Sequence, residues 1–176
     1  MTIRGWAPVL AMAGVLAGCG DDDGTDPDLP DLTRADVAGV YDMTRLTFDP
    51  QGSLPLVDLL DRLDPTDLPD LRISSTEDSL QLTFTDPDGG LLRIVDGSYQ
   101  LRDDGILVSL EDSPDPAKLL LPRHIEYAFD ENEETLAFTG AVSADTARLF
   151  VLVPEWSGEP VTSPLPGTLG VTFRRN

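Results

Sequence analysis

Cysteine, histidine and lysine each occur once in the 176 residues, and these scarcities exclude several kinds of chemistry. A lone cysteine, Cys19, cannot form a disulfide within the chain, and a zinc site built from histidine and cysteine lacks its ligands. A catalytic serine would depend on His124, and the sequence has no Gly-x-Ser-x-Gly motif. Carboxylates are too numerous for any pair to indicate acid–base catalysis. We therefore expect no enzyme activity, no metal and no cofactor.

Basic residues are also few. The chain has 12 Lys and Arg against 32 Asp and Glu, which gives a formal net charge of −20. Nucleic-acid binding needs a cationic surface that displaces counterions, so this charge argues against a nucleic-acid partner. It also argues against flat adhesion to anionic lipid. We interpret most of the acidic side chains as a solvated surface that keeps the protein soluble.

Long apolar runs are absent beyond the N-terminus, where Trp6–Leu16 follows Arg4. This run has the length of a secretory signal and is too short to span a bilayer stably. The residues Leu16-Ala17-Gly18-Cys19 resemble the lipobox of bacterial lipoproteins. The resemblance implies cleavage before Cys19, lipidation of its thiol and amine with palmitate among the acyl groups, and anchoring to a membrane. The alternatives are an ordinary signal peptide cut elsewhere and a short N-terminal membrane anchor.

The segment after Cys19 is rich in glycine, proline and aspartate, and residues 20–31 cannot pack as a regular element. We expect a signal peptide over 1–18, an acidic disordered tether over 19–35 and one folded domain over 36–176. A calcium loop is an alternative for the aspartates of the tether, although the closing glutamate of such loops is missing. Glycine follows Cys19, and by resemblance to lipoprotein sorting rules this favours the outer membrane, facing the periplasm.

From residue 36 onward the dominant pattern is alternation of apolar and polar residues, which is typical of β-strands. One stretch, 54–64, has leucines at helical spacing and predicts a short amphipathic helix after the first strand. Consecutive strands joined by tight turns favour an antiparallel up-and-down barrel of about 8–10 strands, with a β-sandwich as the alternative. The expected strands are 38–48, 71–73, 79–85, 91–95, 99–102, 106–110, 125–129, 136–140, 147–153 and 168–174.

The two ends of this domain are similar to those of lipocalins, which belong to the calycin group of barrels. Gly39-Val40-Tyr41 resembles the Gly-x-Trp opening of that family, with tyrosine in place of tryptophan, and Phe173-Arg174-Arg175 resembles its closing strand. The resemblance implies a lipocalin-like barrel in which Arg174 or Arg175 covers Tyr41. We therefore expect Gly39, Tyr41 and Arg174 to contribute to barrel closure, with the last strand pairing with the first.

An eight-stranded barrel either encloses one small ligand or is filled by its own side chains. The candidate ligand contacts are Tyr99, Tyr127 and Phe129 on strands, together with Trp156 in the long loop 154–167. Trp156 could gate a mouth, contact a partner or plug the barrel end, since loops of this length are often functional. Two functions stay open: a membrane-tethered, monomeric envelope lipoprotein that binds a small apolar ligand, or a lipoprotein with a filled barrel that contacts another envelope protein.

Overall fold

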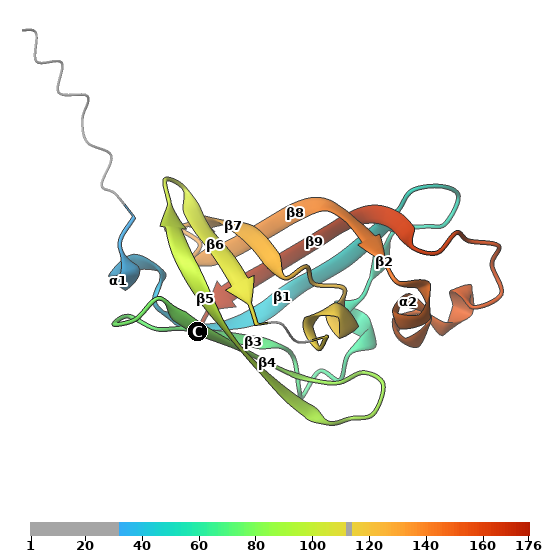
Figure 1. Cartoon of the computed structure of the whole chain (residues 1–176), viewed down its shortest axis with the longest axis horizontal. Coiled ribbons are helices and arrows are strands. Elements are labelled where there is room, and N and C mark those ends of the chain that lie inside the picture. Colours follow the sequence, from blue (N-terminus) through green and yellow to red (C-terminus); the bar gives the residue numbers. More distant parts are fainter. Residues whose placement is uncertain (1–31, 112–113) are drawn as a thin grey trace, which may run out of the picture. The chain divides into compact units, whose positions relative to one another are not determined.

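The computed structural model describes residues 32–111 and 114–176, which form one sheet of nine antiparallel strands (Figure 1). The strands follow one another around the sheet in the order β2-β1-β3-β4-β5-β6-β7-β8-β9, and β9 also pairs with β1. This last pairing closes eight strands into a barrel and leaves β2 as a short addition to β1. The strands are β1 (Gly39–Pro50), β2 (Val57–Asp58), β3 (Asp70–Ile73), β4 (Ser79–Thr85), β5 (Leu92–Arg102), β6 (Gly105–Leu110), β7 (His124–Asp130), β8 (Thr135–Ala144) and β9 (Leu165–Arg175).

The pairing of the last strand with the first decides between the two predicted architectures. The register runs from Tyr41 opposite Arg175 to Pro50 opposite Gly167, with an irregularity between Met43 and Arg45. A sandwich would leave these strands at separate sheet edges, whereas a barrel joins them. The predicted all-β antiparallel barrel is therefore confirmed.

The strands form where the sequence alternates, because each second side chain then enters the interior. In β4 the three buried residues are Leu80, Leu82 and Phe84, and the residues between them are partly exposed. The sharp turn after β4 begins with the Asp86-Pro87 pair, whose proline pre-sets the backbone angle that such turns need. In this part of the chain, the alternation of the strand and the residues of the following turn thus indicate the same structure, a strand that ends at residue 85.

The predicted helix over 54–64 is wrong in extent. The structure has the two-residue strand β2 and then one 3-10 turn, η1 (Leu60–Arg62). Leu59 is fully buried and its amide donates to the carbonyl of Leu46, 2.7 Å away, which ties this segment to β1. The Asp58 carboxylate accepts from the Leu60 amide at 2.9 Å, a local bond that favours a turn over a helix.

The predicted strand over 147–153 is also wrong, because the segment forms the helix α2 (Thr146–Leu152). The carboxylate of Asp145 accepts from the Ala147 amide at 2.9 Å and so caps the first turn. Leu149 and Leu152, three residues apart, are the buried side chains, as expected for one face of a helix. No helix in the described ranges is long and apolar enough to cross a membrane.

The described chain begins beside a second short helix, α1 (Arg34–Val37). The Arg34 guanidinium lies 2.6 Å from the Asp78 carboxylate at the start of β4, so α1 sits at the end of the barrel where β4 begins. Residues 34 and 35, expected in the tether, belong to this helix. The predicted signal peptide, Cys19 and the tether up to residue 31 lie outside the described residues.

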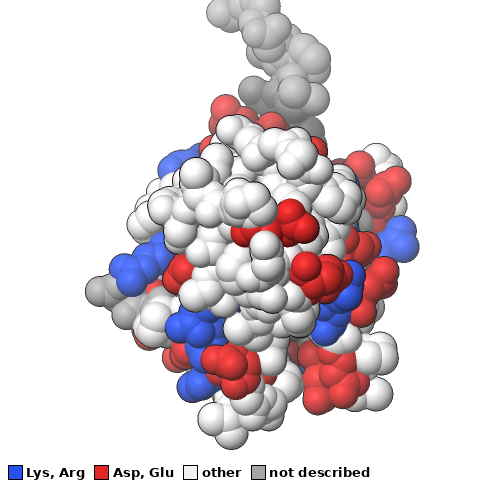
Figure 2. Space-filling view, turned by 90° about the vertical axis from the view of Figure 1, so that its right-hand side faces the viewer, with Lys and Arg blue, Asp and Glu red and all other residues white. Residues whose placement is uncertain are grey.

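Charged side chains lie mainly on the outer surface. Figure 2 looks onto the end of the barrel that carries α2 and shows a broad uncharged area with acidic and fewer basic side chains scattered around it. In the described part of the chain, Asp86 is the one charged residue classed as buried. The interior is therefore apolar, and the exception, Asp86, lies at this same end of the barrel, beside α2.

Candidate binding surfaces of the barrel

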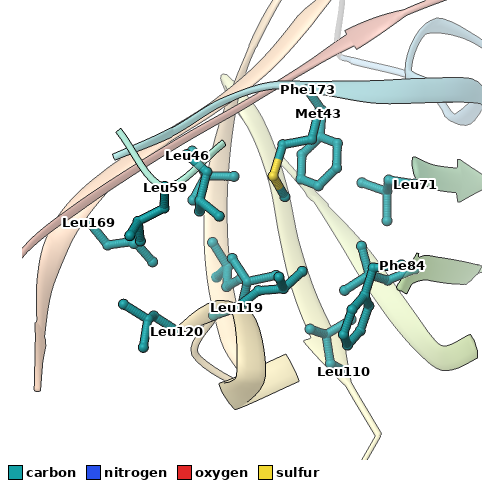
Figure 3. Packing of buried hydrophobic residues seen from close by; sticks show 14 of the residues in the cluster. Met43, Leu46, Leu59, Leu71, Phe84, Leu110, Leu119, Leu120, Leu169 and Phe173 are labelled. Atoms are coloured by element: carbon teal, nitrogen blue, oxygen red, sulfur yellow. The ribbon is translucent and has the colours of Figure 1, made fainter. Parts of the chain in front are cut away.

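The barrel interior is occupied by its own side chains. Figure 3 shows apolar side chains from β1, β3, β4, β6 and β9, with others from the segments that cover the barrel, converging on one interior. Protein cores of this kind are packed as densely as organic crystals. The largest fully buried side chains are Tyr41, Tyr99, Phe48, Phe84, Phe173, Met43, Leu46, Leu59, Leu82, Ile106, Leu119 and Ile125.

Tyr127 and Tyr99, two of the predicted ligand contacts, are part of this core. The ring of Tyr127 packs edge-on against Phe138 and Phe173, with centroids 6.3 and 6.0 Å away. Burial raises the pKa of the Tyr127 hydroxyl well above its usual range. The Tyr99 hydroxyl donates to the carbonyl of Ser74 at 2.9 Å. The ring of Tyr127 and the hydroxyl of Tyr99 thus already contact protein groups in the places where a bound ligand would contact them.

The other two predicted contacts lie apart from each other. Phe129, partly buried on β7, faces the guanidinium of Arg175, which is 5.7 Å from its ring centroid. Trp156 is buried in the 3-10 turn η3 (Pro154–Trp156), which follows α2. The four residues thus do not line a common cavity. Trp156 packs as part of the core, as a plug of the barrel end would.

At the end near α1, one arginine joins the first and last strands. Arg175 lies over the ring of Tyr41, 5.3 Å from its centroid, and donates to the Tyr41 hydroxyl at 2.9 Å. It also donates to the carbonyl of Asp36 and, at 3.2 Å, to the carboxylate of Glu134. Arg175 therefore makes the contact that the resemblance implied for Arg174 or Arg175.

Of the other residues predicted to close the barrel, Gly39 and Tyr41 take part in this contact, whereas Arg174 lies on the exposed side of β9. Arg174 is exposed and lies opposite Asp42 in the β1–β9 register. Gly39 leaves room for the Arg175 side chain, because an added Cβ would lie 3.1 Å from its Nε. The Tyr41 hydroxyl itself donates to the carbonyl of Val37 in α1 at 2.7 Å. The hydrogen bonds of Tyr41 and Arg175 thus connect the closing strands β1 and β9 to the helix α1 at this end of the barrel.

At the opposite end, a buried carboxylate fastens a loop over the barrel. Asp86, 3% exposed, accepts from Lys118 and, at 2.9 Å, from Nη2 of Arg93. Burial alone would raise the pKa of the Asp86 carboxyl, but these bonds and one from the Asp88 amide outweigh it and hold the pKa to about 2. Lys118 belongs to the 3-10 turn η2 (Pro116–Leu119), whose Leu119 is fully buried.

Sequence reasoning missed this group. One signal was present, since Lys118 is the single lysine of the chain and stands in an apolar loop beside Leu119. A lone cation among leucines favours a specific anionic partner over free solvation. The turn residue Asp86 gave no hint of burial, because aspartate is common in such turns for its own local hydrogen bonds.

A half-open apolar groove of about 310 Å³ lies beside η2. One wall is the segment 117–122 and the other is 141–145, at the end of β8. Leu120 in this wall has a φ of 61°, which is unusual for a bulky residue and is held there by its burial. The groove is at the lower limit of the volumes of small-ligand sites.

The largest exposed apolar side chains gather on one hairpin. Among the described residues, five large apolar side chains are exposed, and three of them are Leu91, Leu92 and Ile94 at the start of β5. Leu92 lies opposite Thr85 and Ile94 opposite Thr83 in the β4–β5 register. Sequence reasoning predicted a strand over 91–95 but not which of its faces is exposed.

The single histidine lies on the outer surface. His124 is exposed at the start of β7, and its Nδ1 is 3.1 Å from Oγ of Ser109 on the neighbouring strand. Glu126, on the same face of β7, is exposed as well. His124 and Glu126 thus lie on the exposed face of β7, opposite the buried Ile125 and Tyr127.

Neither a protein-family model, nor a curated protein, nor a solved structure matches this chain. The likeness to lipocalins therefore rests on the architecture: an antiparallel barrel of eight strands in sequence order, closed between the first and the last. This architecture is consistent with the resemblance found in the sequence.

Proposed function

We propose that this protein is a lipid-anchored envelope protein whose barrel is a solid scaffold and whose outer surface binds another envelope protein. The observation that carries this proposal is the filled interior. Tyr99, Tyr127 and Trp156, which could have lined a ligand site, are buried against protein groups. An internal ligand would have to displace these packed side chains, and removing a buried aromatic side chain typically costs about 3–5 kcal/mol.

The direction of the barrel supports binding at the end opposite α1. Residue 32 leads into α1, which is joined to Asp78 just before β4. β4 runs from Ser79 to Thr85, about 20 Å at roughly 3.3 Å per residue, and the β4–β5 turn lies at its other end. The described part of the chain therefore enters the barrel at the end near α1, and the hairpin and α2 lie at the other end (Figure 1).

The anchoring step is tested by labelling bacterial cells with radioactive palmitate. The wild-type chain is expected to incorporate the label, and Cys19→Ser is expected to lose it, because the thiol and the new N-terminus at residue 19 carry the lipid. Incorporation that is equal in the two chains, or absent from both, would contradict the anchor.

The binding step is tested by formaldehyde cross-linking in intact cells. The anchored chain is expected to form discrete adducts with envelope proteins, because its outer surface is its binding surface. A chain that remains uncross-linked while known envelope complexes in the same cells are captured would refute the proposal.

The apolar groove beside η2 favours a second candidate, the binding of a small apolar ligand at the mouth of the barrel. Its wall contains Leu120, Leu121 and Val142, and its one charged lining residue is Asp145. Nile red fluorescence in the presence of the protein measures this binding. Ala141→Trp, which fills the groove from its exposed side, is expected to abolish the signal, whereas Ala137→Trp on the same outer face of β8 is expected to keep it.

A further inference from the structure

We infer that the outer face of the β4–β5 hairpin docks a basic, apolar segment of the partner protein. This hairpin face consists of Leu92 and Ile94 on β5, with Thr83 and Thr85 beside them on β4, and the exposed Leu91 lies directly before β5. The inference rests on the proposed function, because it names the surface and the chemistry of the partner that the function requires.

The first argument is exposure. Leu91, Leu92 and Ile94 are 60%, 65% and 56% exposed, in a protein whose other large apolar side chains are mostly buried. Isolated exposed leucines are normal on protein surfaces, but a contiguous group of them marks an interaction site. Burying this group against a partner removes apolar surface from water, which is the main driving force of association.

The second argument is the absence of charge within the face. Arg93 stands between Leu92 and Ile94 in the sequence, but its side chain turns to the other side of the strand and donates to Asp86. The alternation of side chains along β5 places this cation on the same side as the buried Val95, away from the hairpin face. The exposed strip along β5 is therefore continuous and apolar.

The third argument is the sign of the charges at its two ends. Asp88, 59% exposed, lies in the turn before the strip, and Asp96 is exposed two residues after Ile94 on the same face of β5. Arg148 is 3.9 Å from Asp88, and Arg72, on the far side of Gln81, lies 3.6 Å from Asp70. Arg148 thus lies near Asp88 itself, whereas Arg72 faces Asp70 and Asp96 accepts from the Gln81 amide at 2.9 Å.

The whole-protein charge acts in the same direction. A net charge of −20 attracts cationic partners and repels anionic ones, and this steering raises the association rate of a basic segment. A second copy of the chain carries the same charge and is repelled. The occupant that satisfies both the apolar strip and its acidic ends is an apolar segment flanked by lysine or arginine.

The test uses the full chain with Cys19→Ser in every sample, which removes the predicted lipid attachment and the need for detergent. The probe is a fluorescent heptapeptide with a leucine-isoleucine centre and lysines at both ends, and its anisotropy is followed on titration. Leu92→Asp combined with Ile94→Asp is expected to weaken binding at least tenfold. Leu56→Asp is the matched control, because Leu56 is 57% exposed in another loop, and it is expected to bind like the parent chain.

A charge reversal supplies the second variant. Asp88→Lys combined with Asp96→Lys keeps the apolar strip and is expected to lose the basic peptide and gain a peptide with glutamates in place of the lysines. Both peptides binding equally to all variants would overturn the inference. If the Leu92/Ile94 variant still forms the cross-linked adducts in cells, the hairpin face is wrong and the proposed function stands. If the wild-type chain forms none, the proposed function itself fails.

Discussion

Replacing Asp86 by asparagine tests how the end of the barrel near η2 is held. The carboxylate is 3% exposed and is bound by Lys118 and Arg93, so its pKa is about 2 instead of the ordinary 3.8. The difference, 3.8 − 2, is close to 2, and at about 1.4 kcal/mol per pKa unit it corresponds to roughly 2–3 kcal/mol. We expect Asp86→Asn to lower the free energy of unfolding by about that amount at neutral pH.

The pH dependence gives the sign of the effect. A carboxyl whose pKa is lower in the folded state than in the unfolded state stabilises the fold only while it is ionised. The contribution of Asp86 is therefore complete above about pH 4 and is lost as the pH falls through about 2. The unfolding free energies of wild type and Asp86→Asn are expected to differ by a constant amount from pH 5 to 8 and to converge between pH 4 and 2.

Urea unfolding followed by tryptophan fluorescence measures this difference, and the slope of the transition checks that both proteins unfold to the same extent. The matched control is Asp88→Asn, because Asp88 is exposed and its nearest arginine nitrogen is 3.9 Å away. The control is expected to change stability by less than about 0.5 kcal/mol. Equal stability of Asp86→Asn and wild type at pH 7, or a gap that persists at pH 2, would refute the reasoning.

Three further changes are expected to separate structural contacts from neutral ones in the same unfolding assay. Gly105→Ala should prevent normal strand pairing, because its Cβ would lie 1.9 Å from the Tyr127 carbonyl oxygen, whereas Gly89→Ala has open space and should be tolerated. Arg175→Ala should cost about 1–3 kcal/mol through its contacts with an aromatic ring and a hydroxyl, and Arg174→Ala within about 0.5. Tyr127→Ala should cost about 3–5 kcal/mol, since it empties a packed site; a loss below 1 kcal/mol would mean that the interior is loosely filled.

The barrel could be predicted because its strands are encoded locally. Alternation such as Leu80-Gln81-Leu82 fixes which side chains point inward, and antiparallel neighbours need only short turns. The two errors, 54–64 and 147–153, have the opposite cause. Both segments cover the barrel instead of forming its wall, so their conformation depends on a cap at Asp145 and on the docking of Leu59, which periodicity does not encode.

The binding surfaces were harder to predict, since they depend on contacts between distant residues. Lys118 and Asp86 are 32 residues apart, and no pattern links them. Arg93 reads as an outward-facing residue between two apolar neighbours, yet it lies on the same side of β5 as the buried Val95 and donates to Asp86, so Leu92 and Ile94 are on the surface. The buried residues further along β5 thus set an orientation that the hydrophobicity of Leu92 and Ile94 would not favour.

The filled interior is the central claim, and native mass spectrometry of the chain purified from a bacterial envelope tests it most directly. Because the positions inside the barrel are occupied by Tyr99, Tyr127 and Phe173, the folded protein is expected to have the mass of the polypeptide with its covalent modifications alone. The same mass should be found after unfolding. A stoichiometric apolar molecule that is present in the folded protein and released on unfolding would contradict the account.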